Sequence, residues 1–198
     1  MNLNELRNQA YKTACDHGFH DKELNNEYFL CLVISELMEA VEADRKGRLG
    51  LNCKSLFKKD YDCYPNLVEE EKRFKCAFEK NVKDSLPDEF ADIAIRLLDL
   101  AGLRSIDLLE LEEPLFDKFN IIPEFVNWKS QLKETSFTER MFFLCSLLTS
   151  GESIEDVVRS SVAITFLNAD ILEVDLLWHI SQKMKYNELR PVMHGKKY

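Results

Sequence analysis

Two pairs of acidic residues, each with the spacing of about one helical turn, lie inside otherwise apolar stretches of the sequence. The pairs are Glu36-x-x-Glu39 and Glu89-x-x-Asp92. Residues three apart are neighbours on one helix face, so each pair directs two carboxylates the same way. Four converging carboxylates would repel one another strongly unless cations neutralised them. Because all the donors are hard oxygens, the pattern favours a Mg²⁺ site, or a Mn²⁺ site, over zinc or copper.

The apolar neighbourhood of these pairs carries more weight than their spacing, because 35 Asp and Glu residues among 198 make some acidic pairs of this kind expected by chance. Helical periodicity puts Glu36 and Glu89 on the apolar, packing sides of their helices. Carboxylates in such positions are costly unless they are paired or bind a metal. A buried ion pair with Arg96 or Lys83 is therefore the alternative to a metal site.

A row of polar side chains near the C-terminus offers a second candidate function. Lys183, Asn187 and Arg190 stand at i, i+4 and i+7, so one helix face presents an ammonium, an amide and a guanidinium. Such a row can bind phosphate oxygens. Lys83 is a further candidate for a phosphate contact. The alternative is an ordinary basic helix end with a frayed terminus.

Bulk properties exclude several classes of function. The net charge of −9 and the lack of a Lys/Arg stripe make duplex nucleic acid an unexpected partner. No apolar run reaches the length of a membrane span, and the first residues lack the features of a signal peptide. Six cysteines without C-x-x-C spacing indicate a reduced, cytoplasmic setting.

The positions of the histidines disfavour two other kinds of metal site, a zinc cluster and a di-iron centre. His17 and His20 beside Cys15 resemble a zinc cluster, but a loop at a helix end is the simpler interpretation. No histidine forms the Glu-x-x-His pairing that di-iron helical bundles require.

Nearly every segment has helical periodicity, and none sustains the alternation of a strand. The sequence therefore predicts a single all-α domain, a multi-helix bundle, over residues 1–198. The acidic pairs lie on two long helices, expected over 26–47 and 86–102. The second is expected to begin with a capping box at Ser85-x-x-Asp88.

The segment between the two acidic helices, residues 48–82, is predicted to be an insertion, with a flap over 48–66 and a helix over about 67–81. A likeness between 27–33 and 139–147 suggests a degenerate internal duplication, whose second copy lacks the acidic pairs. The other helices are expected at about 4–16, 103–111, 136–149, 153–167 and 170–189.

The sequence resembles the MazG-like superfamily of all-α nucleoside triphosphate pyrophosphohydrolases and, more distantly, the dimeric dUTPases. The likeness covers residues 26–47, 83–102 and 179–198, about a third of the chain, and is not evident over 103–178. The family pattern is E-E-x-x-E, a spacer, then E-x-x-D. Both acidic pairs match it, but Ser35 stands where the first Glu is usual. The matching blocks are ISELMEAVEADRKG, KDSLPDEFADIAIRLLDLAG and KMKYNELRPVMHGKKY.

The resemblance implies hydrolysis of a (deoxy)nucleoside triphosphate to the monophosphate and pyrophosphate. It implies that Glu36, Glu39, Glu89 and Asp92 bind Mg²⁺, and that Glu36 and Glu39 are catalytic. We expect Glu39 to orient the attacking water as its base. Family members commonly form oligomers, so a homo-oligomer, most simply a dimer, is expected.

The other candidate residues fit the same resemblance. Lys183, Asn187 and Arg190 are similar to the K-x-x-x-N-x-x-R element that contacts phosphates in dimeric dUTPases. Arg96 and Asp99 are expected to support the site, one by holding a metal ligand and the other by holding a hydrated cation.

Two alternatives to an enzyme remain open at this point. The chain could be a catalytically silent helical protein that binds nucleotides or a protein partner on the same scaffold, since Ser35 and the unmatched second half depart from the family. It could also be a purely structural helical module, in which case Mg²⁺ would not raise its melting temperature.

Overall fold

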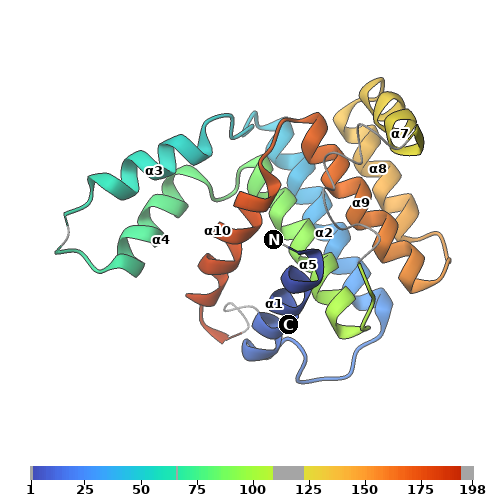
Figure 1. Cartoon of the computed structure of the whole chain (residues 1–198), viewed down its shortest axis with the longest axis horizontal. Helices are drawn as coiled ribbons and strands as arrows, with labels where there is room; N and C mark the ends of the chain where they lie inside the picture. The colour runs from blue at the N-terminus through green and yellow to red at the C-terminus, as the bar shows by residue number, and fades with distance from the viewer. Residues whose placement is uncertain (1, 66, 109–122, 193–198) are drawn as a thin grey trace.

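The computed structural model describes residues 2–65, 67–108 and 123–192, and within these ranges the chain forms helices and no strand. The predicted all-α multi-helix bundle is confirmed. No described helix is long and apolar enough to cross a membrane. In chain order the helices are α1 (Leu3–Asp16), α2 (Asn26–Arg45), α3 (Cys53–Cys63), α4 (Glu70–Asn81), α5 (Leu86–Leu103), α7 (Pro123–Lys133), α8 (Phe137–Leu148), α9 (Ile154–Ile171) and α10 (Leu176–Glu188) (Figure 1).

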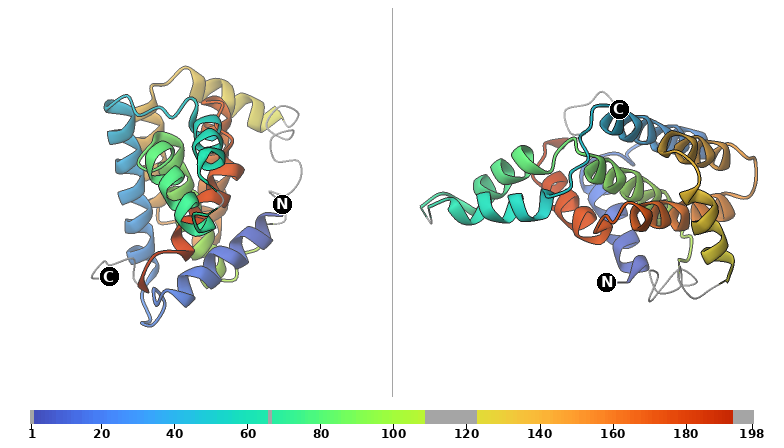
Figure 2. Two further views of the ribbon diagram at one scale, coloured as in Figure 1. Left: turned by 90° about the vertical axis from the view of Figure 1, so that its left-hand side faces the viewer. Right: turned by 90° about the horizontal axis from the view of Figure 1, so that it is seen from above.

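Helix α5 is the centre of the bundle and packs against α1, α2, α9 and α10. Thirteen of its eighteen residues are buried, which is the pattern of a helix enclosed on nearly all sides. Pro87 lies in its first turn, where the missing N–H costs nothing and the fixed φ favours the helix. Figures 1 and 2 show α5 running between α2 on one side and α10 on the other.

Helices α2 and α5 are antiparallel, and hydrogen bonds join both of their ends. The backbone N–H of Leu86 donates to the carbonyl of Arg48 at 2.8 Å. At the opposite end, Arg104 Nε donates to Asn26 Oδ1 at 2.7 Å. This pairing brings the middle of α2, where Glu36 is buried, against the first half of α5.

Helix α1 crosses α5 closely, and Gly102 makes that approach possible. A Cβ atom at Gly102 would overlap the Cβ of Tyr11 and lie 2.9 Å from its Cγ. These atoms are at the root of the Tyr11 side chain, so rotation cannot remove the overlap.

Gly102→Ala is therefore expected to destabilise the protein by about 1–3 kcal/mol, the usual cost of overpacking a core. Urea unfolding followed by circular dichroism measures it. In an uncrowded helix the same change stabilises by roughly 0.5–1 kcal/mol, and that outcome would contradict the close crossing.

The expected flap over 48–66 is wrong in part, because α3 occupies most of it. Phe57 and Tyr61 repeat at helical spacing and stack at 5.8 Å, and Phe57 packs edge-on against Trp178 of α10. On α4, Phe78 stacks on Tyr186 of α10 at 4.5 Å. The α3–α4 hairpin thus shares a small aromatic core with α10, separate from the main core, and it projects from the bundle (Figure 2).

Helix boundaries in the second half differ from the expected ones. Helix α9 continues to Ile171, and α10 begins at Leu176 rather than near residue 170, because Asp175 caps it by accepting from the Trp178 N–H at 3.2 Å. Residues 104–108 form a turn and an irregular stretch instead of a helix, and the rest of the helix expected at 103–111 lies outside the described residues.

Candidate active-site cleft

Helices α1, α2, α5 and α10 surround an open cleft with a cavity of about 200 Å³. Every residue selected from the sequence as a site candidate lines it. These residues are Glu36, Glu39, Lys83, Glu89, Asp92, Arg96, Asp99, Lys183, Asn187 and Arg190.

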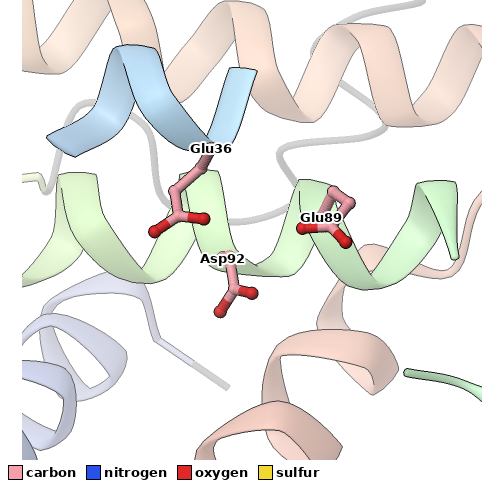
Figure 3. A group of neighbouring side chains, drawn as sticks. All are labelled: Glu36, Glu89 and Asp92. Carbon is pink, nitrogen blue, oxygen red and sulfur yellow. The ribbon is translucent and has the colours of Figure 1, made fainter. Parts of the chain in front are cut away.

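Three carboxylates from two helices converge in the cleft (Figure 3). Glu36 of α2 and Glu89 and Asp92 of α5 each place one oxygen within 4.8 Å of the other two. Glu36 and Glu89 are each only 5 % exposed, and Asp92 is half-buried. The expectation that both acidic helices turn these groups inward is met for all three residues.

Glu39 takes a different position from the other predicted ligands. It lines the cleft but is exposed, and it is not part of the group of converging oxygens. A carboxylate at the rim of an acidic cleft can reach solvent water, which suits a general base better than a buried metal ligand. Ser35 is exposed, donates to the Leu32 carbonyl at 2.8 Å and does not line the cleft.

The alternative of a buried ion pair is realised for one of its two candidates. Arg96 Nε lies 3.1 Å from Glu36 Oε1. Lys83 is exposed at the edge of the cleft, and its ammonium lies 3.8 Å from Asp84 Oδ2. Arg96 thus holds one carboxylate of the group in place, as expected for a residue that supports the site.

Lys183 binds carboxylates deep in the cleft, which differs from a role as a simple phosphate contact. Its Nζ lies 2.6 Å from Asp92 Oδ2 and 2.8 Å from Asp88 Oδ2, with 8 % of the side chain exposed. The ammonium therefore fixes the position of Asp92. In the row of polar side chains predicted near the C-terminus, Asn187 is also buried, while Arg190 is half-buried at the cleft.

Asp88 is a site residue that the sequence interpretation missed. The expected capping box with Ser85 does not form: the side chain of Ser85 caps no backbone N–H, and Asp88 instead accepts from the Asp84 N–H at 3.0 Å and from Lys183. The available signal was its spacing, since Asp88 and Asp92 are four residues apart and so share a helix face.

His20 is a second missed residue, and it does not belong to a zinc cluster. Its Nε2 lies 2.7 Å from Asp99 Oδ1, and both side chains are 8 % exposed. The rings of Tyr11 and Phe29 pack on it at 5.1 and 5.5 Å. Within the described residues, Glu36, Glu89 and Asp92 are the sole group whose ligand atoms converge as a metal site requires.

The electrostatics of the cleft oppose ionisation of its carboxylates. Burial, reinforced by the Asp92 charge, raises the pKa of Glu89 to about 8. The same two causes raise the pKa of Glu36, and Arg96 only partly opposes them. Burial raises the pKa of Asp88 to about 6. For Lys183, burial alone would lower the pKa, but Asp92 and Asp88 outweigh it and raise the pKa.

A count of formal charge shows what the cleft lacks. Around the converging oxygens, four acidic groups would supply four negative charges if all were ionised, and the two cations paired with them supply two positive charges, which would leave two negative charges. The other charged residues that line the cleft are outside this count. The acidic groups are Glu36, Asp88, Glu89 and Asp92, and the cations are Arg96 and Lys183. No described residue donates a hydrogen bond or forms an ion pair to the Glu89 carboxylate. The residues therefore fit one divalent cation with oxygen ligands, such as Mg²⁺ or Mn²⁺.

No family model, curated protein or solved structure matches this chain. The resemblance to the MazG-like superfamily therefore remains one of sequence motifs.

Proposed function

We propose that this chain hydrolyses a (deoxy)nucleoside triphosphate to the monophosphate and pyrophosphate, with Mg²⁺, or Mn²⁺, as its cofactor. The observation that supports this most directly is a cleft in which three carboxylates from two helices converge, with side chains able to bind phosphate around them. A polyphosphate would be repelled from such a cleft without a divalent cation, and Mg²⁺ commonly binds through a few carboxylates together with substrate phosphates.

The residues would divide the work by position. Glu36, Glu89 and Asp92 would hold the cation, with Arg96 and Lys183 fixing Glu36 and Asp92. When bound, Mg²⁺ would supply positive charge that offsets the phosphate charge and polarises the phosphorus under attack.

The remaining groups would act on water and on phosphate. Glu39, exposed at the rim, would accept a proton from the water that attacks the α-phosphorus. The bond from that phosphorus to the bridging oxygen would break, and pyrophosphate would leave with the electron pair. Lys83, Asn187 and Arg190 would contact the phosphate oxygens as negative charge builds on the leaving group.

A pyrophosphate-release assay tests the proposal directly. The full chain is incubated with each common ribo- and deoxyribonucleoside triphosphate, with Mg²⁺ and separately with EDTA. We expect stoichiometric monophosphate and pyrophosphate from at least one substrate, with Mg²⁺ only. Orthophosphate as the product, or turnover that EDTA leaves unchanged, would refute it.

Metal binding should also appear as a pH-dependent gain in stability. The pKa of Glu89 is raised from 4.5 to about 8, so its contribution to stability is present at low pH and is lost as the pH rises through 8. We expect millimolar Mg²⁺ to raise Tm more at pH 8.5 than at pH 6, because the cation binds the ionised group. Differential scanning fluorimetry measures this, and Glu89→Gln should remove most of the difference. If Glu89→Gln kept the full wild-type difference between the Mg²⁺-induced rises in Tm at pH 8.5 and pH 6, the assignment of Glu89 as a metal ligand would be contradicted.

Arg190→Ala should lower kcat/KM by about 10–100-fold, since a guanidinium that binds phosphate is removed from the cleft. Lys185→Ala is the matched control, because Lys185 is on α10 but is exposed and pairs with Glu70 at 3.2 Å. Steady-state kinetics of both variants make the comparison. If Arg190→Ala and Lys185→Ala had equal kcat/KM values, Arg190 would be excluded from the site.

A second candidate function is nucleotide binding without turnover. The ion pair between Arg96 and Glu36 favours it, because that pair partly neutralises the acidic group without a metal. Calorimetric titration of the chain with each nucleoside triphosphate would identify this outcome. At least one triphosphate would bind, and none of the panel would be hydrolysed.

A further inference from the structure

The part of the cleft beyond the acidic group has apolar walls that phosphate chemistry does not use. Helix α1 crosses α5 beside Gly102, so the cleft-lining residues of α1 lie toward the end of α5 that is far from Lys83. The Phe19 ring lies 5.7 Å from the Arg96 guanidinium. The residues of these walls are Ala10, Ala14, Phe19 and Ile95. Small apolar side chains and an aromatic ring are the kind of surface against which a flat ring packs.

One buried polar group faces this apolar region. Asp99 lines the cleft, is 5 % exposed, and accepts a hydrogen bond from His20 through Oδ1. An ionised carboxylate cannot donate, so the proton in this bond is assigned to His20 Nε2. No described residue donates a hydrogen bond to Asp99 Oδ2, which leaves acceptor capacity for a ligand.

The position of Asp99 along α5 fits the length of a nucleotide. Asp92 and Asp99 are seven residues apart, and a rise of 1.5 Å per residue separates them by about 10 Å along the helix axis. That is comparable with the span from an α-phosphate across the sugar to the base. A nucleotide whose phosphates lie at Asp92 therefore places its base near Asp99.

We propose that Asp99, held in position by His20, binds the nucleobase, and that the preferred substrate carries a base with an exocyclic amino group. The proposal rests on the proposed function for the placement of the phosphates. An amino N–H donates to the carboxylate, whereas uracil and thymine present a carbonyl oxygen where cytosine has its amino group. Two acceptors then face each other in a buried site, and such mismatches are strongly rejected.

The test compares a matched pair of nucleosides, deoxycytidine and deoxyuridine, which need neither metal nor phosphate to bind. We expect the full chain to bind deoxycytidine at least about tenfold more tightly by ligand-observed NMR titration. Asp99→Asn should bring the ratio of the two affinities close to one, because a carboxamide both donates and accepts. The ratio of kcat/KM for dCTP and dUTP should change in the same direction.

Two further variants separate recognition from structural damage. Asp84→Asn makes the same chemical change in the same cleft at the exposed Lys83 end, and it should keep the wild-type ratio. His20→Gln keeps the Asp99 charge but weakens the donor that positions it, so the ratio should fall part of the way. Circular dichroism confirms that each variant is folded.

The outcomes distinguish this proposal from the enzymatic one. Selective nucleoside binding that depends on Asp99, without turnover of any triphosphate, would support the base site and refute hydrolysis. Equal binding of the two nucleosides, no binding of either, or a ratio that Asp99→Asn leaves unchanged would overturn the base site even if pyrophosphate is released.

Discussion

Glu89→Gln is expected to reduce pyrophosphate release by about 10²–10³-fold, comparable with the loss of one group that stabilises the transition state electrostatically. The change keeps the shape of the side chain and removes a carboxylate to which no described residue donates a hydrogen bond or forms an ion pair. Glu36→Gln should have an effect at least as large, because it also leaves Arg96 without its partner. Single-turnover kinetics at saturating Mg²⁺ measure both variants.

The fold should survive these two substitutions. Burial raises the pKa of both carboxylates, so their ionised forms oppose folding near neutral pH, and a neutral amide removes that opposition. Glu71→Gln is a matched control, since Glu71 is exposed on α4 and lies outside the cleft. Turnover at the wild-type rate by Glu89→Gln would exclude Glu89 from the site.

Lys183→Met should be the most destabilising single change in the cleft, at about 3–5 kcal/mol. It leaves Asp88 and Asp92 without the ammonium that bridges them at 2.8 and 2.6 Å, and Asp88 has a side chain only 1 % exposed. Chemical unfolding at pH 8 gives the free energy, because there Asp88, with a pKa of about 6, is ionised. A loss below about 1 kcal/mol, typical of a surface pair, would contradict the geometry.

Adding Asp88→Asn to Lys183→Met isolates the charge effect. The double variant should recover part of the lost stability, because one of the two unpaired charges is removed. Lys185→Met on the same helix should change stability by less than about 1 kcal/mol, since its partner Glu70 is exposed.

The sequence was sufficient to predict the helical class, the two acidic helices and the inward direction of Glu36 and Glu89. All three follow from the periodicity of apolar residues within one segment, which is local information. The Ser136-x-x-Glu139 motif at the start of α8 is local information of the same kind, and it forms a capping box with hydrogen bonds in both directions.

Contacts between distant segments were not predictable in the same way. Periodicity shows which side of a helix is buried but not which other helix covers it. The pair of Lys183 with Asp88 spans 95 residues, and the pair of His20 with Asp99 spans 79. For this reason a phosphate contact was expected of Lys183, a helix cap of Asp88, and only a loop position of His20.

One misplaced helix end and one helix that was not expected have equally specific causes. Helix α9 ends where Glu173 adopts a φ of 57°, a conformation that a residue other than glycine rarely takes, so the sequence showed no glycine stop. The turn formers over 48–66 concealed α3, whose stability comes from aromatic contacts with Trp178 on a helix far along the chain.

Because α5 is enclosed by four other helices and also carries Glu89, Asp92 and Asp99, the heat tolerance of the bundle and the geometry of the cleft cannot be tuned independently in this protein. A substitution beneath α5 that shifts it by a fraction of an ångström would also displace the carboxylates that α5 contributes to the cleft. Laboratory evolution for thermostability should therefore accumulate its gains on the exposed faces of α3, α4 and α8, and leave the axis of the bundle unaltered.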